Sequence, residues 1–187
     1  MRKRDKYFEV AAAHSAGLNW ITILDSNHHR HENYRARYDI HLHSVLSRRP
    51  DTMRKLWTFL HECGHSKLHR DLKRSIDVPY HSVELEAERY ALEAIRAARI
   101  DISPKVLCST HTYIFGELLG DVRAGSDPTE GVFEYLEETA FHDPECTVEA
   151  GKKYVERVRS LPRTTAYLAA WYHNVQHPIL TRIEGAR

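Results

Sequence analysis

The alternation of hydrophobic and polar positions predicts one short helix and two strands near the start of the chain. Residues Tyr7–Ala16 have helical spacing, and Trp20–Leu24, WITIL, are rich in the β-branched side chains of a strand. Residues Tyr34–Leu46 alternate polar with apolar side chains, which predicts a second strand with one buried and one solvent-facing side. His41 and His43 fall on the solvent-facing side, so we expect neither to bind a metal. The predicted buried side consists of Tyr34, Ala36, Tyr38, Ile40 and Leu42.

Two longer helices are predicted next. Pro50 and Asp51 suit the first turn of one helix, because proline lacks a backbone N–H and a carboxylate favours the positive end of the helix dipole. At 3.6 residues per turn, one side of this helix carries apolar residues together with His61 and His65. The other helix is expected to start at Ser82, as N-cap, and to end near residue 100. The apolar positions are Met53, Trp57, Leu60, Gly64 and Leu68 in the first and Ala87, Ala91, Ala94, Ile95 and Ala98 in the second.

The remainder of the chain is predicted to be helical. Ser103 and Pro104 form an N-cap and first turn, and Gly120 is expected to end that helix before a polar, glycine-containing loop. The pattern therefore predicts an α+β fold that is mainly helical, with a core over residues 1–104 and a helical part over 105–187 packed on it as one domain. After that loop, three further helices are expected at Phe133–Phe141, Val148–Leu161 and Thr164–Val175.

Composition and charge exclude several classes of protein. The 187 residues are 42% hydrophobic and 28% charged, which is ordinary for one folded domain. A formal net charge of +1 indicates no nucleic-acid or membrane-surface binding, and no stretch approaches the ~20 apolar residues of a membrane-spanning helix. Cys63, Cys108 and Cys146 are an odd number, and the basic amino terminus lacks the apolar core of an export signal. We therefore expect a cytoplasmic protein that binds neither membrane nor nucleic acid directly, and its oligomeric state stays open.

One stretch, LHECGHSKLH at Leu60–His69, carries the main candidate chemistry. On a helix, His61 and His65 stand one turn apart, so both can offer a ring nitrogen to one metal ion. Glu62 lies about 100° round the helix, where it can act as base toward a metal-activated water. This HExxH pattern is typical of zinc hydrolases. Because the chain has 14 histidines, chance alone would produce the pattern in roughly one such chain in ten, so a third ligand is needed as support.

The predicted helix from Ser82 offers that third ligand. A projection at 100° per residue places Glu84 inside the apolar stripe, about 20° from Ala91. A carboxylate buried there costs several kcal/mol unless a cation compensates for it, so we expect Glu84 to complete a three-ligand zinc site. Glu88, one turn further on, can accept a hydrogen bond from the outer nitrogen of a ligand histidine. Glu86 falls on the opposite, polar side and is expected to be solvent-exposed.

Two residues after the motif are weaker ligand candidates. A metzincin site needs glycine where this chain has Leu68, so Asp71 is not expected to turn back toward the metal. His69 continues the histidine stripe, but it would stand another ~6 Å along a straight helix, too far to share the ion. We expect His69 either behind a ligand histidine or in solvent.

The order of these features resembles the ImmA/IrrE family of small cytoplasmic zinc peptidases. A strand and an alternating strand come first, then an HExxH helix followed by the residues LH, and then a second helix with the pattern ExEAxxxA. The resemblance covers about Trp20 to Pro104, and its ligand arrangement is gluzincin-like. It implies a zincin-like fold in which a small sheet packs on the HExxH helix and on a second ligand helix. The residues that carry it are His61, Glu62, Gly64, His65, Leu68, His69, Glu84, Glu86, Ala87, Tyr90, Ala91 and Pro104.

The resemblance implies a function as well as a fold. It makes His61, His65 and Glu84 the ligands of Zn2+ and Glu62 the base, and it implies a protein substrate such as a helix-turn-helix repressor. The chain departs from the family at Glu88, where the family has Asn or Asp, and at a tyrosine two residues later, where the family has Phe.

The combined prediction is a zinc-dependent endopeptidase that uses metal-activated water with Glu62 as general base. The alternating strand is expected to pair an extended substrate along its edge. The residue that stabilises the oxyanion stays open: Tyr80, His81 and His111 are candidates only because each has a group that can donate a hydrogen bond, and a plain surface position on a helix or loop is the stronger expectation for each. Two alternatives stay open: a zincin-fold binding or regulatory module without proteolysis, and a metal hydrolase of a non-peptide bond. The intact Glu62 argues against the first, because a purely structural site needs no base.

Overall fold

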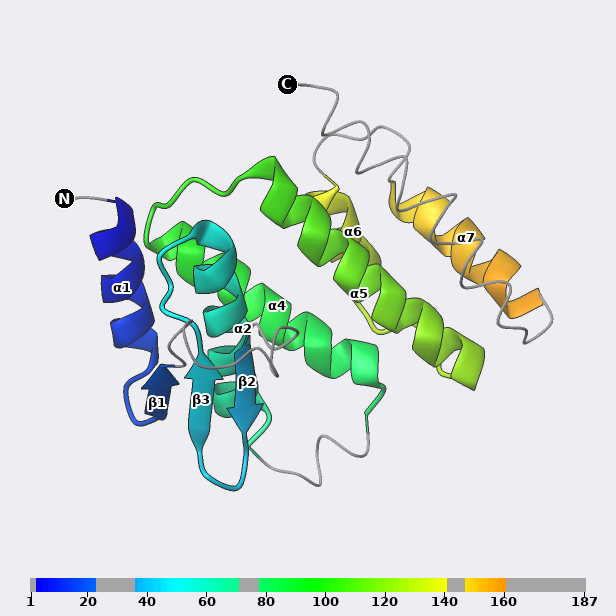
Figure 1. Ribbon diagram of the computed structural model, residues 1–187. Helices are drawn as coiled ribbons and strands as arrows, with labels where there is room; N and C mark the ends of the chain where they lie inside the picture. Colours follow the sequence, from blue (N-terminus) through cyan, green and yellow to red (C-terminus); the bar gives the residue numbers. More distant parts are fainter. Residues whose placement is uncertain (1–2, 23–35, 71–77, 141–146, 161–187) are drawn as a thin grey trace, which may run out of the picture. The chain divides into compact units, whose positions relative to one another are not determined.

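The computed structural model describes residues 3–22, 36–70, 78–140 and 147–160. Over these residues six helices accompany a small mixed sheet, so the predicted α+β, mainly helical class is confirmed (Figure 1). The chain forms two compact units. The first contains Met1–Val78 and Val83–Ile102, and the second contains Pro79–Ser82 and Ser103–Arg187. That the two parts pack as one domain stays a prediction.

A three-stranded sheet belongs to the first unit. Its strands are β1, Asn19–Thr22, β2, Ala36–Asp39, and β3, Ser44–Ser47, in the order β1-β3-β2. The central strand β3 runs parallel to β1 and antiparallel to β2, and its Val45 is fully buried. Within the described part of the chain β2 is therefore an edge strand, whose outer backbone groups can meet partners other than β3.

The prediction of one continuous strand over Tyr34–Leu46 is wrong, because the chain turns between β2 and β3 at residues 40–43. Asp39 Oδ1 accepts hydrogen bonds, each 3.0 Å long, from the backbone N–H groups two and three residues further on. His43 then adopts a left-handed backbone conformation with φ of +46°. Local hydrogen bonding by the Asp39 side chain thus prevails over the strand pattern. Leu42, predicted to be buried, is 63% exposed at this turn.

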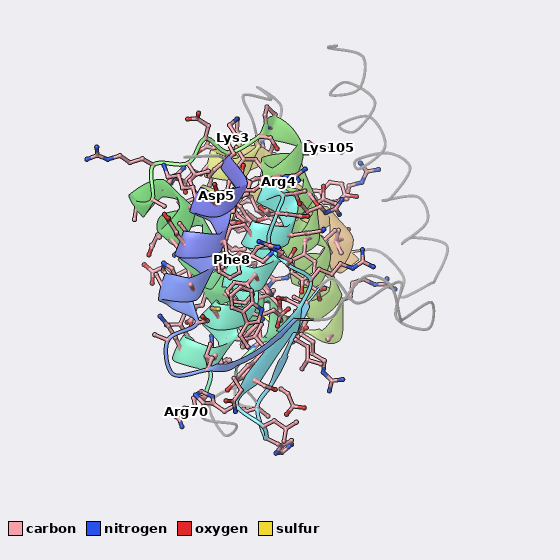
Figure 2. All side chains as sticks on the ribbon, turned by 60° about the vertical axis from the view of Figure 1, so that its left-hand side comes forward. Lys3, Arg4, Asp5, Phe8, Arg70 and Lys105 are labelled. Carbon is pink, nitrogen blue, oxygen red and sulfur yellow. The ribbon has the colours of Figure 1, made fainter. Side chains whose placement is uncertain are left out.

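Helix α1, Lys3–His14, belongs to the same unit and begins with Asp5 in its first turn, where a carboxylate suits the helix dipole. The side chains of its first residues are seen in Figure 2, with Phe8 one turn further along. The ring of Phe8 lies 5.4 Å from the ring of Trp20 in β1, between centroids, and Trp20 lies 4.7 Å from Phe59. Because Phe59 belongs to the next helix, these tilted ring contacts link α1, the sheet and that helix, from the exposed Phe8 to the buried Phe59.

That next helix, α2, spans Met53–Leu68 and contains the HExxH motif. Its N-cap is Thr52, whose side chain accepts a hydrogen bond from the backbone N–H of Lys55. The helix therefore begins slightly later than the Pro50-Asp51 start that the sequence suggested. Its buried residues, which face the core, are Leu56, Trp57, Phe59, Leu60, His61, Cys63, Gly64 and Ser66.

Helix α4, Tyr80–Ala97, supplies the remaining candidate ligand. It begins before Ser82, so the prediction of Ser82 as N-cap is wrong: this residue lies inside the first turn, where its N–H donates to Pro79 O at 3.0 Å. Arg99, with φ of +52°, follows the end of the helix. The predicted apolar stripe is buried from Ala87 to Ile95, with Ala87, Ala91 and Ile95 all at 0% exposure, and Ala98 at its end is half-buried.

Gly64 allows α2 and α4 to approach closely within the first unit. A Cβ atom at Gly64 would lie 3.0 Å from Ala87 Cα, 3.1 Å from Ala87 O and 3.2 Å from Tyr90 Cβ. Carbon atoms in ordinary contact are about 3.5–4.0 Å apart, so a larger residue at this crossing would require the neighbouring atoms of α4 to shift by a few tenths of an ångström. The close approach brings the histidines of α2 next to the glutamates of α4.

The second unit contains α5, Pro104–Ala124, whose predicted N-cap is confirmed because the Ser103 side chain accepts from the Val106 N–H. The prediction that Gly120 ends this helix is wrong. The helix continues past Gly120 and ends at Gly125, whose φ of +105° requires the left-handed conformation that favours glycine.

Two further helices complete the described part of the second unit. They are α6, Val132–Thr139, and α7, Val148–Ser160, and both match predicted segments to within a few residues. Val155 and Val158 of α7 are each 3% exposed, which shows the face that α7 buries. The helix predicted at Thr164–Val175 lies outside the described residues.

Candidate metal centre

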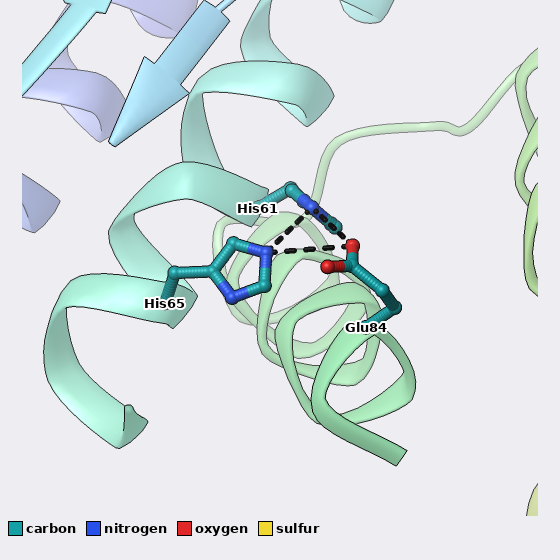
Figure 3. A group of neighbouring side chains, drawn as sticks. All are labelled: His61, His65 and Glu84. Atoms are coloured by element: carbon teal, nitrogen blue, oxygen red, sulfur yellow. Dashed lines mark hydrogen bonds and ion pairs between the residues drawn. The ribbon is translucent and has the colours of Figure 1, made fainter. Parts of the chain in front are cut away.

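Three side chains from two helices converge in the first unit. His61 and His65 project from α2 and Glu84 projects from α4 (Figure 3). The Nε2 atoms of the two histidines are 3.0 Å apart, and Glu84 Oε2 lies 3.1 Å from His61 Nε2 and 3.4 Å from His65 Nε2. The ligand atoms thus all lie within 4.8 Å of one another, and the group can hold a metal ion.

The triangle of donor atoms has the size that a zinc ion needs. Tetrahedral bonds of about 2.0–2.1 Å place two zinc ligands about 3.3 Å apart, and the observed separations of 3.0, 3.1 and 3.4 Å lie around that value. Two imidazole nitrogens and one carboxylate are also a typical donor set of catalytic zinc, which keeps a fourth position for water. The residues present therefore fit this metal.

Burial and charge set the electrostatics of the group. His61 is 7% exposed and Glu84 is 3% exposed. Burial by itself lowers the pKa of His61, but hydrogen bonds to Glu84 and Glu88, with the charges of Glu88 and Glu62, raise this pKa to about 10. Burial by itself raises the pKa of Glu84, but hydrogen bonds to both histidines hold this pKa well below its usual range. An ionised carboxylate therefore faces the histidines.

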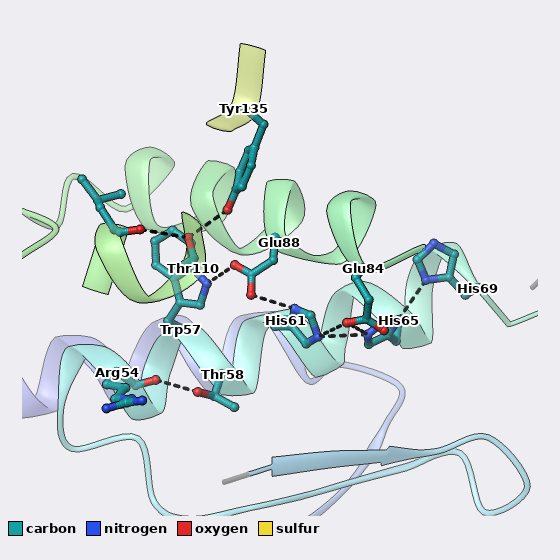
Figure 4. Close-up of polar contacts among 11 residues, drawn as sticks. Arg54, Trp57, Thr58, His61, His65, His69, Glu84, Glu88, Thr110 and Tyr135 are labelled. Atoms are coloured by element: carbon teal, nitrogen blue, oxygen red, sulfur yellow. Dashed lines mark hydrogen bonds and ion pairs between the residues drawn. The ribbon is translucent and has the colours of Figure 1, made fainter. Parts of the chain in front are cut away.

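Glu88 and Trp57 lie behind His61. Glu88 Oε1 is 3.2 Å from His61 Nδ1, and the Trp57 indole N–H donates to Glu88 Oε2 (Figure 4). Both side chains are buried, with Glu88 at 5% and Trp57 at 3% exposure. The indole thus orients one carboxylate oxygen so that the other faces the outer nitrogen of the histidine, which is how metal-binding histidines are commonly held.

Glu88 therefore lies where the sequence placed it, behind a ligand histidine, but Trp57 was missed. The available signal was its spacing: Trp57 precedes His61 by one helical turn on the same face of α2. A buried indole N–H requires an acceptor, and Glu88 follows Glu84 by one turn on the facing helix.

A different pair lies behind His65. His65 Nδ1 is 3.1 Å from His69 Nδ1, and His69 Nε2 is 2.9 Å from Glu86 Oε2. His69 is 5% exposed, whereas the Glu86 side chain is 42% exposed. His69 therefore lies behind a candidate ligand, and Glu86, predicted to be solvent-exposed, is partly exposed but also contacts His69. His69 is the C-cap residue of α2, with φ of −119°, so it leaves the straight helical line that the projection assumed.

Glu62 contacts the edge of the sheet. Its Oε2 accepts a hydrogen bond of 2.7 Å from the backbone N–H of Tyr38 in β2. This bond fixes the Glu62 carboxylate, whose negative charge contributes to raising the pKa of the neighbouring His61. His41 and His43 are not part of the candidate metal-ligand group found among the described residues. The Tyr38 contact was missed, because it depends on where β2 ends and turns.

The three oxyanion candidates all belong to the second unit. His81 is fully buried: its Nδ1 lies 2.7 Å from Asp121 Oδ2, and its Nε2 accepts a hydrogen bond from the Thr129 N–H at 3.0 Å. Both ring nitrogens are thus engaged, so the prediction is wrong for His81. His111 is also buried, with Nδ1 2.8 Å from Leu136 O, and Tyr80 is 54% exposed.

Comparisons with protein-family models, with curated proteins and with solved structures gave no significant match to the chain. Among the helices that the structure describes, none combines the length and apolar character needed to cross a membrane.

Cys63 and Cys108 are free, buried thiols. The rejected ligand Asp71 and the third cysteine, Cys146, lie outside the described residues.

Proposed function

We propose that the chain is a zinc-dependent endopeptidase with a zincin-like core. The observation that carries the proposal is the convergence of the His61, His65 and Glu84 donor atoms beside a glutamate, Glu62, that the edge of the sheet holds in place. Each feature has a purpose in a hydrolase: three ligands leave a position for water, and the glutamate supplies a base. The motif resemblance to the ImmA/IrrE peptidases supports the same assignment.

When bound, zinc would supply a Lewis acid that lowers the pKa of water and polarises a carbonyl group. Glu62 is the residue that accepts the proton of the attacking water and returns it to the leaving amine. The Tyr38 N–H donates a hydrogen bond to Glu62 Oε2 and so fixes the orientation of this carboxylate. Glu88, held by the Trp57 indole, keeps the Nε2 atom of His61 directed into the site.

The sheet edge provides a place for an extended substrate. Strand β2, Ala36–Asp39, pairs with β3 along one side, and the Tyr38 N–H on its other side points at Glu62. A peptide added along that outer side would pair with the outward-facing backbone groups of β2 other than the Tyr38 N–H, which is bonded to Glu62, and its backbone would come next to the base. The resemblance suggests a regulatory protein such as a helix-turn-helix repressor as the protein substrate and partner.

Metal analysis and one substitution test the proposal. Purified protein is expected to contain about one zinc ion per chain and to cleave the regulator encoded beside its gene. Glu62→Gln should keep the zinc and lose activity by about 10²-fold or more, because the base is gone while the ligands remain. Glu93→Gln, an exposed residue of α4, is the matched control and should cleave normally.

Absence of zinc, or cleavage that Glu62→Gln leaves unchanged, would contradict the proposed mechanism. Zinc binding without hydrolysis of any peptide would favour the alternative of a binding module or of a hydrolase acting on another bond. Survival of the neighbouring regulator alongside cleavage of a generic unfolded protein would remove only the substrate assignment.

A further inference from the structure

We infer that His69 and Glu86 form a positioning pair that fixes the ring of His65 in the metal centre. The inference rests on the proposed metal binding and adds Glu86, a residue that the metal site itself does not use. His65 Nδ1 lies 3.1 Å from His69 Nδ1, and His69 Nε2 lies 2.9 Å from Glu86 Oε2. The pair thus extends outward from His65, on the side away from the metal-facing Nε2 atom.

The protons in this chain of contacts have one consistent arrangement. A histidine that binds a metal through Nε2 carries its proton on Nδ1. The Nδ1–H of His65 then donates to Nδ1 of His69, which must accept and therefore carries its own proton on Nε2. That Nε2–H donates to the carboxylate of Glu86. Every donor meets an acceptor, and the terminal acceptor is a charged group, which strengthens the bonds that lead to it.

His61, the other candidate ligand histidine, also has a glutamate at its outer nitrogen, but without an intervening histidine. Glu88 faces the outer nitrogen of His61 directly, at 3.2 Å, whereas Glu86 reaches His65 only through His69. Glu84, Glu86 and Glu88, at alternate positions of α4, therefore have two kinds of role around one site. The first is a candidate ligand, and each of the other two ends a contact that begins at a ligand histidine.

Helix capping does not explain the position of the His69 side chain. As C-cap residue, His69 donates its backbone N–H to His65 O at 2.9 Å, and any residue could make that bond. The imidazole ring is nevertheless 5% exposed and has both nitrogens in contact with polar partners. Burial of a polar ring with both nitrogens directed at partners is what a specific positioning role requires.

The test compares Glu86→Ala with Glu86→Gln and with the control Glu93→Ala on an exposed position of the same helix. Zinc affinity is measured on the full chain by competition with a chelator. Glu86→Ala should weaken zinc binding by about ten-fold or more, the usual effect of losing an outer partner. Glu86→Gln keeps an oxygen that accepts from His69 and should recover most of the affinity. Glu93→Ala should bind zinc like the unmodified chain.

A second readout separates positioning from general stability. Histidine ring ¹⁵N NMR of the zinc-loaded chain should show Nδ1-protonated His65 and Nε2-protonated His69, and Glu86→Ala should disturb the signals of His69. The melting temperature of the metal-free chain should stay unchanged in Glu86→Ala, because this side chain is partly exposed. A loss of affinity accompanied by an equal loss of metal-free stability in Glu86→Ala would overturn the positioning role.

The remaining outcomes are distinct. If the unmodified chain binds zinc and Glu86→Ala binds it equally well, with unchanged histidine signals, the positioning pair is refuted and the proposed function stands. If the unmodified chain binds no zinc, the proposed function fails and the inference falls with it. If zinc binding follows the expected order but no peptide is cleaved, the positioning pair stands and only the peptidase assignment fails.

Discussion

Substitution of Gly64 by alanine tests the close crossing of α2 and α4 on which the metal centre depends. The added Cβ would lie 3.0 Å from Ala87 Cα and 3.1 Å from Ala87 O, both backbone atoms that cannot rotate away. Ordinary carbon contacts begin at about 3.5 Å, so the two helices must separate by roughly half an ångström. Because His61 and His65 belong to one helix and Glu84 to the other, that separation opens the ligand triangle.

The expected energies follow from two opposing effects. Overpacking of a core costs about 1–3 kcal/mol, and replacement of a helical glycine by alanine contributes about 1 kcal/mol of stability. Gly64→Ala should therefore lower the free energy of unfolding by about 0–2 kcal/mol. Zinc affinity should fall further, by about ten-fold, because ligand distances tolerate shifts of only about 0.2 Å.

The control is Gly120→Ala in α5, where an added Cβ would meet no atom within 4 Å. This change keeps only the helix effect and should raise stability by about 0.5–1 kcal/mol. Urea unfolding of the metal-free variants and chelator competition for zinc measure the two quantities. The reasoning is refuted if Gly64→Ala gains as much stability as Gly120→Ala and binds zinc like the unmodified chain.

Three further predictions concern other buried groups. Trp57→Phe removes the hydrogen bond to Glu88 and should weaken zinc binding several-fold in chelator competition; unchanged affinity would show that the indole does not orient the carboxylate. Asp121→Ala leaves two buried donors of His81, the backbone N–H and Nδ1–H, without their acceptor. Asp121→Ala should lower the free energy of unfolding in urea by about 2–3 kcal/mol. Asp121→Asn keeps an oxygen acceptor and should lower it less; equal losses in the two variants would contradict the acceptor role of Asp121. Burial raises the pKa of the Cys63 thiol to about 12. Peptide mapping should therefore show no alkylation of Cys63 at pH 8 until the chain unfolds. Rapid labelling of Cys63 in the folded chain would contradict the raised pKa.

The candidate ligand group could be predicted because it depends on helical periodicity, which fixes the direction of each side chain from its position along its own helix. Residues four apart on one helix share a face wherever that helix lies in the protein, so His61 and His65 had to point the same way. The apolar stripe on α4 likewise singled out Glu84 and Glu88, because an apolar face becomes buried and a buried carboxylate needs a partner.

The errors arose where a local side-chain hydrogen bond or the end of an element decided the structure. Alternation of side chains continued through residues 40–43, so the pattern could not distinguish one long strand from two short strands and a turn closed by Asp39. Gly120 and Gly125 look alike in the sequence, but only the second has a positive φ, because helical hydrogen bonding continues past the first.

The sequence by itself determined which residues can bind a metal, through spacing along two helices. Only the tertiary structure decided what surrounds them: the crossing at Gly64, the Tyr38 N–H on Glu62, and the contact of Glu86 with His69. These contacts join separate elements, and their geometry depends on how closely and in what register those elements pack. A helical projection describes the face of one helix, and it contains no information about the residue that meets that face from another element.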